Sequence, residues 1–183
     1  GCFSFYPCKH ITTGEGGMLL TKHPEIAEQA KKLRSFGYGA DSHSDVTRAG
    51  FNYRMSEIQA AIGVAQLKRF PKMLAARKVN AAFLGRALEE YKPFGGHYAV
   101  GCFVPKGKDR DEVRRSLWAA GVETSIYYPR AVPDLAYYKE KYDPPIYPVA
   151  RRFAARSLVF PVGSYLTKDR LAKAVRLFKE IVV

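Results

Sequence analysis

Lys9 is the side chain that is best placed for covalent chemistry. It lies in a turn-rich loop, 7–17, between two short apolar runs, Phe3–Tyr6 and Met18–Thr21, which we expect to be buried strands. Desolvation favours the neutral form of an amine, which can attack a carbonyl group. The pattern therefore indicates a lysine that could capture a carbonyl cofactor as an imine. The alternative is a solvated lysine, one of 30 basic residues, and composition alone favours it.

The glycines that follow Lys9 do not form a phosphate-binding loop. Gly14-Glu15-Gly16-Gly17 lacks both the GxGxxG spacing and the GK[ST] ending of such loops. Glycine adopts backbone conformations that other residues avoid. We therefore expect a turn or bulge that leads into the second strand.

Two polar residues further along have the spacing of a binding pair. Asn52 and Arg54 face the same side if their segment is extended, because side chains alternate along a strand. A guanidinium group there could meet a carboxylate or a phosphate. For Arg54 a surface salt bridge is an equally good interpretation. Tyr127 and Tyr128 are weaker candidates for a substrate contact, because tyrosines in a predicted strand more often belong to the core.

Apolar periodicity predicts the elements that position these residues. A helix should begin near Pro24 and end at Gly37, which has the place of a C-terminal cap. Its apolar face carries Ile26, Ala30, Leu33 and Phe36. The glycine-rich and polar segment that follows, 37–53, is long enough to be functional.

A long second helix is predicted after this segment. Ser56 and Gln59 form a capping-box pattern, with serine at the cap and glutamine three residues later. The helix continues toward Tyr91, and we expect Pro71 to kink or divide it near its middle.

After Pro93 the pattern changes to that of a smaller unit. We predict a strand over 98–104, a helix over 109–120 and a strand over 122–128. A loop rich in proline and tyrosine spans 129–148.

Two helices are expected to finish the chain, the second of them starting at Thr167. The predicted fold class is α/β. Residues 1–75 would be the remnant of a large domain that carries the lysine loop, and residues 76–183 a small C-terminal α+β domain.

Composition limits the class of protein. The chain has 183 residues, of which 47% are apolar, so a packed core is expected in one domain or two small ones. The formal charge of +13 favours anionic partners, either nucleic acid, anionic lipid or a phosphate-bearing small molecule. Nucleic acid is not favoured, because the basic residues are scattered and no recognition motif occurs.

The sequence also bears on location and on metals. No apolar run approaches the roughly 20 residues that span a bilayer, so we expect a cytoplasmic protein without membrane contact. Cys2, Cys8 and Cys102 fit neither a disulfide framework nor a zinc site, so reduced thiols and no metal are expected.

Two blocks of sequence resemble a known family. Ser4-Phe5-Tyr6-Pro7-Cys8-Lys9, with the Ile11–Gly17 segment after it, is similar to the active-site lysine signature of the DegT/DnrJ/EryC1/StrS family of pyridoxal phosphate-dependent sugar aminotransferases. Gly50–Gly63 resembles the GxNxRxxxxQAAIG segment of the same family. Segments around 121–129 and 155–161 resemble parts of its small domain. The resemblance implies the C-terminal portion of a fold-type-I transferase, a remnant of a mixed-sheet large domain plus a small α+β domain.

The resemblance also implies roles for the candidate residues. Lys9 would hold pyridoxal 5′-phosphate as an imine and later move a proton between the amino donor and the cofactor. Ser4 would bind the cofactor phosphate, and Asn52 would reach the phosphate of the partner subunit in a homodimer. Arg54, Tyr127 and Tyr128 would contact substrate. The reaction would transfer an amino group, most simply from glutamate, to a nucleotide-linked keto-sugar.

The family places its cofactor-ring aspartate in a half that precedes the lysine. The chain begins at Gly1 without methionine, so we expect an upstream half of the same protein and poor activity without it. The alternative is a non-catalytic binding or assembly module derived from such an enzyme.

Overall fold

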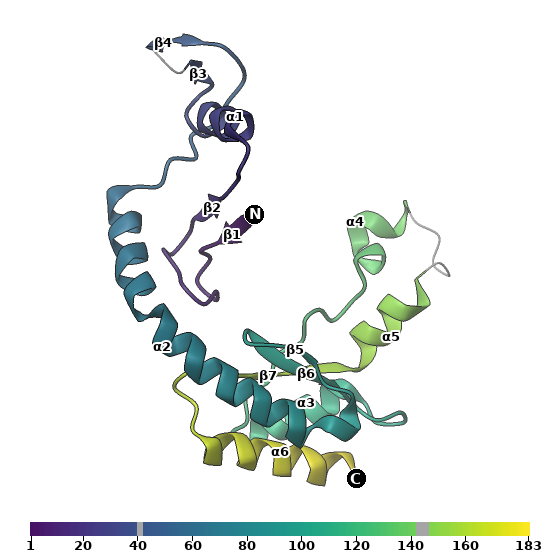
Figure 1. The fold of residues 1–183 in the computed structure, drawn as a ribbon. Helices are drawn as coiled ribbons and strands as arrows, with labels where there is room; N and C mark the ends of the chain where they lie inside the picture. The colour runs from purple at the N-terminus through teal and green to yellow at the C-terminus, as the bar shows by residue number, and fades with distance from the viewer. Residues whose placement is uncertain (40–41, 142–146) are drawn as a thin grey trace. The chain divides into compact units, whose positions relative to one another are not determined.

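The computed structural model describes residues 1–39, 42–141 and 147–183. Contacts divide the chain into two compact units, Gly1–Pro71 and Lys72–Val183. In the described ranges, no helix is long and apolar enough to cross a membrane. The elements along the chain (Figure 1) are β1 (Cys2–Ser4), β2 (Gly17–Leu19), α1 (Pro24–Arg34), β3 (Tyr38–Gly39), β4 (Ser42–Val46), α2 (Glu57–Ala87), η1 (Glu89–Tyr91), β5 (Phe94–Gly95), β6 (Ala99–Phe103), α3 (Arg110–Ala119), η2 (Val132–Asp134), α4 (Ala136–Lys139), α5 (Pro148–Arg156), β7 (Ser157–Pro161) and α6 (Lys168–Val182).

The first two strands form a hairpin. β1 pairs antiparallel with β2, with Phe3 opposite Met18 and Ser4 opposite Gly17. Both strands are exposed, so the prediction that they are buried is wrong for this chain. The reason is that a two-stranded ladder cannot bury its own faces, and the described residues add no third strand to it.

Helix α1 is shorter than predicted and none of its residues is buried. It ends at Arg34, because Phe36 and Gly37 both have left-handed backbones, with φ of 60° and 83°. The Gly37 N–H donates to the Lys32 carbonyl at 2.8 Å, which satisfies one of the last carbonyls of the helix. Gly37 therefore ends the helix as expected, whereas Phe36 leaves the predicted apolar face.

Helix α2 begins with the predicted capping box. The Ser56 N–H donates to Gln59 Oε1 at 2.9 Å, and the Gln59 N–H donates to Ser56 Oγ at 3.3 Å. The helix runs through Pro71 without interruption, so the predicted division there is wrong. It ends at Ala87 and a single 3-10 turn, η1, completes the path to Tyr91.

The second unit is built on an antiparallel sheet in the order β5-β6-β7. Val100 of β6 lies opposite Phe160 of β7, and both side chains are buried. The last turns of α2 together with α3 and α6 pack on this sheet around one apolar core. Its side chains with no exposed surface are Leu84, Leu88, Cys102, Val104, Leu117, Leu158, Phe160, Val162 and Phe178.

Strand β7 was missed in the sequence, where two helices were expected to follow one another. Four of its five residues are buried. A short apolar run of this length has no periodicity that separates strand from helix. Helix α6 confirms the other part of the prediction, since the Thr167 hydroxyl caps it by accepting from the Arg170 N–H at 3.4 Å.

The strand predicted over 122–128 is wrong. Only Ser125 pairs with the sheet, through two backbone hydrogen bonds of 2.8 and 2.9 Å with Val159. The start of the segment is held instead by α3, because the Val122 N–H donates to the Leu117 carbonyl. The loop predicted over 129–148 contains η2 and α4, and its residues 142–146 lie outside the described ranges.

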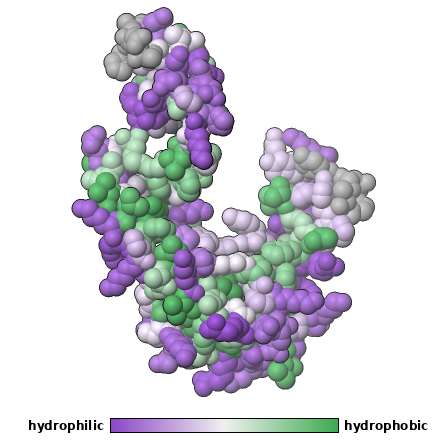
Figure 2. All heavy atoms as spheres, in the orientation of Figure 1, coloured by the Kyte–Doolittle hydropathy of each residue, from purple (hydrophilic) through white to green (hydrophobic). Residues whose placement is uncertain are grey.

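The two units differ in burial. The described residues of the first unit have only Phe5, Thr13 and Gly37 buried. Its large apolar side chains are mostly exposed, among them Phe3 (54%), Leu20 (54%) and Leu67 (58%). Figure 2 shows hydrophobic residues gathered over β1, β2 and the first turns of α2. This face of the first unit is apolar and uncovered.

Candidate active site

Lys9 lies near the tip of the loop that joins β1 to β2. Its backbone N–H donates to the Tyr6 carbonyl at 3.0 Å, which closes a turn, and its side chain is exposed. The expected burial of Lys9 between two strands is therefore absent in this chain. The turn fixes the position of the lysine backbone, and the surroundings of its amine depend on what covers the loop.

Ser4 is linked to Lys9 through one intervening residue. The Ser4 Oγ accepts the Tyr6 N–H at 3.3 Å, while the Tyr6 carbonyl accepts the Lys9 N–H. Because Ser4 Oγ is used here as an acceptor, its hydroxyl proton is left to donate to another group. The hydroxyl and the lysine backbone thus belong to one hydrogen-bonded turn.

The base of the loop is pinned by backbone groups of Phe5. The Phe5 N–H donates to Gly16 at 2.9 Å, and its carbonyl accepts from the Thr13 N–H at 3.1 Å and from Thr12 Oγ1 at 3.0 Å. Phe5 and Thr13 are themselves buried, 9% and 4% exposed. These contacts rigidify the loop on both sides of the lysine.

The glycines after Lys9 act in the turn, as predicted. Gly14 and Gly16 have φ of 79° and 149°, conformations that favour glycine. A Cβ atom at Gly16 would lie 2.5 Å from Thr13 Oγ1, and one at Gly17 would lie 2.9 Å from the Phe3 carbonyl oxygen. The chain needs glycine here for backbone geometry and close approach.

The loop also rests on helix α2 through a residue whose second role the sequence did not indicate. Gln59 caps the helix with its Oε1 and donates from Nε2 to the Glu15 carbonyl at 3.0 Å. A glutamate at this position of a capping box could not donate this hydrogen bond. The choice of glutamine over glutamate is therefore the feature of the sequence that could have indicated the contact. His10 adds an edge-to-face contact with Phe70, with ring centroids 6.3 Å apart.

An apolar cavity of about 390 Å³ lies between the hairpin and α2. Its wall includes Phe3, Ile11, Met18, Met55 and Leu67. The lysine loop therefore has a hydrophobic base and a polar, solvent-facing tip.

Asn52 lies in a different segment of the same unit. It forms an antiparallel bridge with Ser35, and its neighbours Phe51 and Tyr53 donate to the carbonyls of Leu33 and Arg34 at 2.7 and 2.9 Å. The segment is therefore extended against the end of α1, which is the conformation that the prediction for Asn52 and Arg54 assumed. The Asn52 side chain is exposed.

Arg54 contacts an aromatic ring. Its guanidinium carbon lies 4.7 Å from the centroid of Phe36, a cation–π geometry. In the described part of the chain it forms no salt bridge. The Phe36 ring thus contacts the Arg54 guanidinium without neutralising its charge.

Two glycines, Gly37 and Gly50, let this segment approach the backbone that follows α1. A Cβ atom at Gly50 would lie 2.2 Å from the Gly37 nitrogen, and one at Gly37 would lie 1.7 Å from the Arg48 carbonyl oxygen. Only glycine permits this approach of two backbones. The two glycines are thirteen residues apart in one polar segment, so no local sequence pattern predicts that their backbones are in contact.

Tyr127 and Tyr128 belong to the second unit. Tyr127 is 40% and Tyr128 74% exposed, so the alternative that they are core residues is wrong in this chain. The Tyr127 ring lies 6.2 Å from that of Tyr98. Lys9, Ser4, Asn52 and Arg54 are all in the first unit.

Comparison with known proteins identifies the family. The model of the DegT/DnrJ/EryC1/StrS aminotransferase family matches residues 1–179. The chain belongs to this family. Membership implies pyridoxal phosphate as the cofactor, and it makes the fold that of the C-terminal part of a fold-type-I transferase.

Curated members of the DegT/DnrJ/EryC1/StrS family are similar along nearly all of the chain. The erythromycin biosynthesis sensory transduction protein EryC1 of Saccharopolyspora erythraea is 32% identical over 97% of this chain and 50% of its own length. The UDP-N-acetyl-3-dehydro-alpha-D-glucosamine 3-aminotransferase of Acidithiobacillus ferrooxidans is 29% identical over 98% of this chain and 50% of its own. The chain spans about half the length of these relatives.

A solved structure has a similar fold. DesV of S. venezuelae, in complex with a ketimine intermediate, has a TM-score of 0.86 and 27% identity over 98% of this chain and 50% of that one. The fold class predicted from the sequence is therefore confirmed.

Proposed function

We propose that the chain is part of a pyridoxal phosphate-dependent aminotransferase that acts on a nucleotide-linked keto-sugar. The observation that supports the proposal most directly is the hydrogen-bonded turn that joins Ser4 to Lys9 through Tyr6, in a member of an aminotransferase family. The name of the 3-aminotransferase relative supports a nucleotide-sugar substrate. Glutamate as the amino donor is part of the proposal.

The residues of the lysine loop fit the cofactor chemically. A primary amine suits an aldehyde, and a hydroxyl whose proton is free to donate suits a phosphate oxygen. Pyridoxal phosphate supplies an electron-withdrawing ring that stabilises a carbanion next to the substrate nitrogen. Lys9 would hold the cofactor and then, as a free amine, carry a proton between substrate and cofactor carbons.

Arg54 and Asn52 would serve the anionic groups. The Phe36 ring leaves the Arg54 guanidinium charged and able to donate to a carboxylate or phosphate. The Asn52 amide would donate to a phosphate oxygen of the partner subunit's cofactor in a homodimer. Tyr127 and Tyr128, whose rings are exposed, would contact the sugar nucleotide.

A covering partner surface is part of this proposal. The uncovered apolar face over β1, β2 and α2 supports contacts with an upstream half of the same protein and with a second subunit. Such contacts would also provide the burial that the Lys9 amine lacks here. The poor activity of the chain alone and its cytoplasmic location stay predictions.

The test is chemical trapping of Lys9. The protein is incubated with pyridoxal phosphate, reduced with borohydride and mapped by peptide mass spectrometry. We expect a pyridoxyl group on the peptide that contains Lys9, and its loss in Lys9→Ala. Lys22→Ala, which removes an exposed lysine of the same unit, is the matched control and should keep the adduct. An adduct that persists in Lys9→Ala, or that lies only on another lysine, overturns the proposal.

A further inference from the structure

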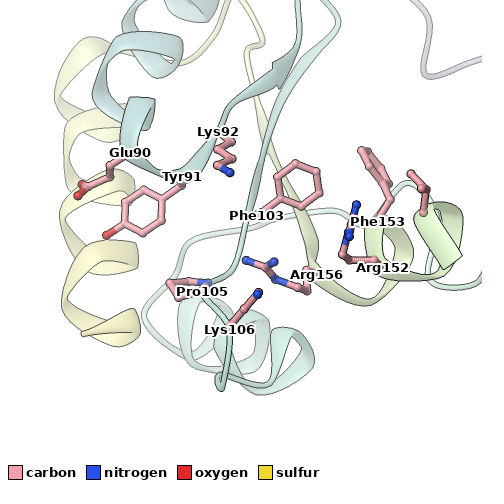
Figure 3. Close-up of a pocket in the computed structure, with 10 residues that line it drawn as sticks. Glu90, Tyr91, Lys92, Phe103, Pro105, Lys106, Arg152, Phe153 and Arg156 are labelled. Atoms are coloured by element: carbon pink, nitrogen blue, oxygen red, sulfur yellow. The ribbon is translucent and has the colours of Figure 1, made fainter.

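A cavity of about 670 Å³ in the second unit combines basic side chains with an aromatic wall (Figure 3). It lies between η1, the end of β6 and helix α5. Its lining belongs wholly to residues 90–156, within the compact unit Lys72–Val183. The cavity is therefore a property of that unit alone.

The charges around the cavity are not balanced. Its basic side chains are Lys92, Lys106, Arg152 and Arg156. Glu90 is the single acidic residue of the lining, and its Oε1 lies 2.6 Å from Lys179 Nζ, which is outside the cavity. Because Glu90 is paired with Lys179, the four basic side chains of the lining form no ion pair with a carboxylate among the described residues.

Arg156 is positioned for a ligand. Its Nε donates to the Val104 carbonyl at 2.8 Å, which fixes the plane of the guanidinium group. In the part of the chain that the structure describes, its terminal nitrogens have no hydrogen-bond partner. Figure 3 shows Arg156 and Lys106 close to one another, with the Lys92 ammonium turned toward the same space. A planar guanidinium held in this way loses little rotational freedom when it binds a phosphate.

Aromatic rings form the neighbouring wall. Phe103 and Phe153 pack edge to face with centroids 5.2 Å apart, and Arg156 lies 6.0 Å from the Phe103 centroid. Phe94 packs against both phenylalanines from the sheet, at 5.2 and 4.7 Å. The rings are thus held in place and offer a rigid apolar surface to a planar group.

We propose that this cavity binds a nucleotide, with its phosphates on the basic side chains and its base against the phenylalanine wall. Several cations without counterions concentrate polyphosphate over simple anions, and a concave aromatic wall adds affinity for a flat heterocycle. A concave cavity of this size suits a small molecule better than a duplex or a membrane. The proposal holds whether or not Lys9 carries a cofactor.

Calorimetric titration at low salt tests the contributions of the phosphates and of the base to binding. ATP, pyrophosphate and adenosine are the probes, and we expect ATP to bind at least tenfold more tightly than either part. The double variant Lys92→Gln/Lys106→Gln should lose at least tenfold in ATP affinity. Arg115→Gln/Lys173→Gln removes the same charge from exposed positions of the same unit outside the cavity and should change the affinity less than threefold.

The affinity for the proposed site is taken as the part of ATP binding that is lost in the Lys92/Lys106 variant. ATP bound elsewhere on the protein is unaffected by this variant and is therefore not attributed to the site. Equal losses in both variants would mean a diffuse electrostatic attraction and overturn the proposal. A variant that loses binding of a DNA duplex or of anionic vesicles, with no ATP binding in the parent protein, would assign the patch to a macromolecule instead. Unchanged thermal melting confirms that each variant is folded.

Photolabelling places the ligand independently. The protein is irradiated with 8-azido-ATP and mapped. We expect the label on the peptides that carry Phe103 or Phe153, with competition by unlabelled ATP. A label confined to other peptides overturns the assignment.

Discussion

At the residue scale, the local backbone geometry of Lys9 could be predicted from the sequence, whereas its solvent exposure could not. Its place in a turn followed by glycines could be predicted, because turn residues act through their own backbones. The exposure of its side chain could not be predicted, because burial depends on segments far away in the sequence. Arg54 shows the same limit, since its contact with Phe36 joins residues 18 positions apart that become neighbours only when Asn52 bridges Ser35.

Cys102 carries a prediction at this scale. Its thiol has no exposed surface, and burial raises its pKa to about 12. The thiol therefore stays protonated through the neutral and mildly alkaline range, and the thiolate is the reactive form. We expect iodoacetamide at pH 8.5 to modify the exposed Cys2 and Cys8 at least a hundredfold faster than Cys102, as measured by peptide mass spectrometry.

Denaturant provides the control for this labelling. In unfolding concentrations of urea the three thiols should react at similar rates, because the burial of Cys102 is lost. Fast labelling of Cys102 without denaturant would contradict its place in the core of the second unit.

At the element scale, the helix starts were predictable, whereas the strands were predictable only in part: β6 lies within the strand predicted over 98–104, but β7 was not predicted. Ser56 with Gln59, and Thr167 before α6, start helices through side chains only three residues from their partners. Strand β7 exists because β6 lies beside it, more than 50 residues earlier in the chain. The segment 122–128 has strand composition but pairs only at Ser125, since α3 holds its start.

The cap of α3 carries a prediction at the element scale. Asp109 Oδ1 accepts the Glu112 N–H at 2.7 Å at the start of this helix, and α3 contributes Val113 and Leu117 to the core. Asp109→Ala should lower the free energy of unfolding by about 1 kcal/mol, the usual cost of a lost cap. Urea denaturation measures the change.

Asp109→Asn is the matched variant, because asparagine keeps an acceptor oxygen at the cap. Its effect should be less than half that of alanine. Equal destabilisation by both substitutions would attribute the effect to the negative charge near the helix start rather than to the cap.

At the scale of the whole molecule, the two units should differ in local stability. The second unit has a continuous buried core, whereas the described part of the first unit buries three residues. Amides protected by few buried contacts open more often. In the 183-residue chain we expect hydrogen exchange in β1, β2 and α1 to be at least tenfold faster than in β6 and α6.

Mass spectrometry of peptides after timed exchange in deuterated buffer measures this difference. Helix α2 serves as an internal control, since its residues 57–71 should exchange faster than residues 80–87, which pack on the core of the second unit. Equal protection along α2 would mean that the first unit is stabilised by something other than its own burial.

The hairpin that carries Lys9 has a consequence for protein engineering. The Leu20 N–H donates to the Gly1 carbonyl at 2.8 Å, and three residue pairs fix the register between β1 and β2. A single insertion in β2 would turn Met18 to the opposite face and shift Gly17 away from Ser4, even if the lysine turn itself survived. The segment from β1 to β2, with the loop between them, should therefore be exchanged between homologous proteins as one piece and with its length preserved.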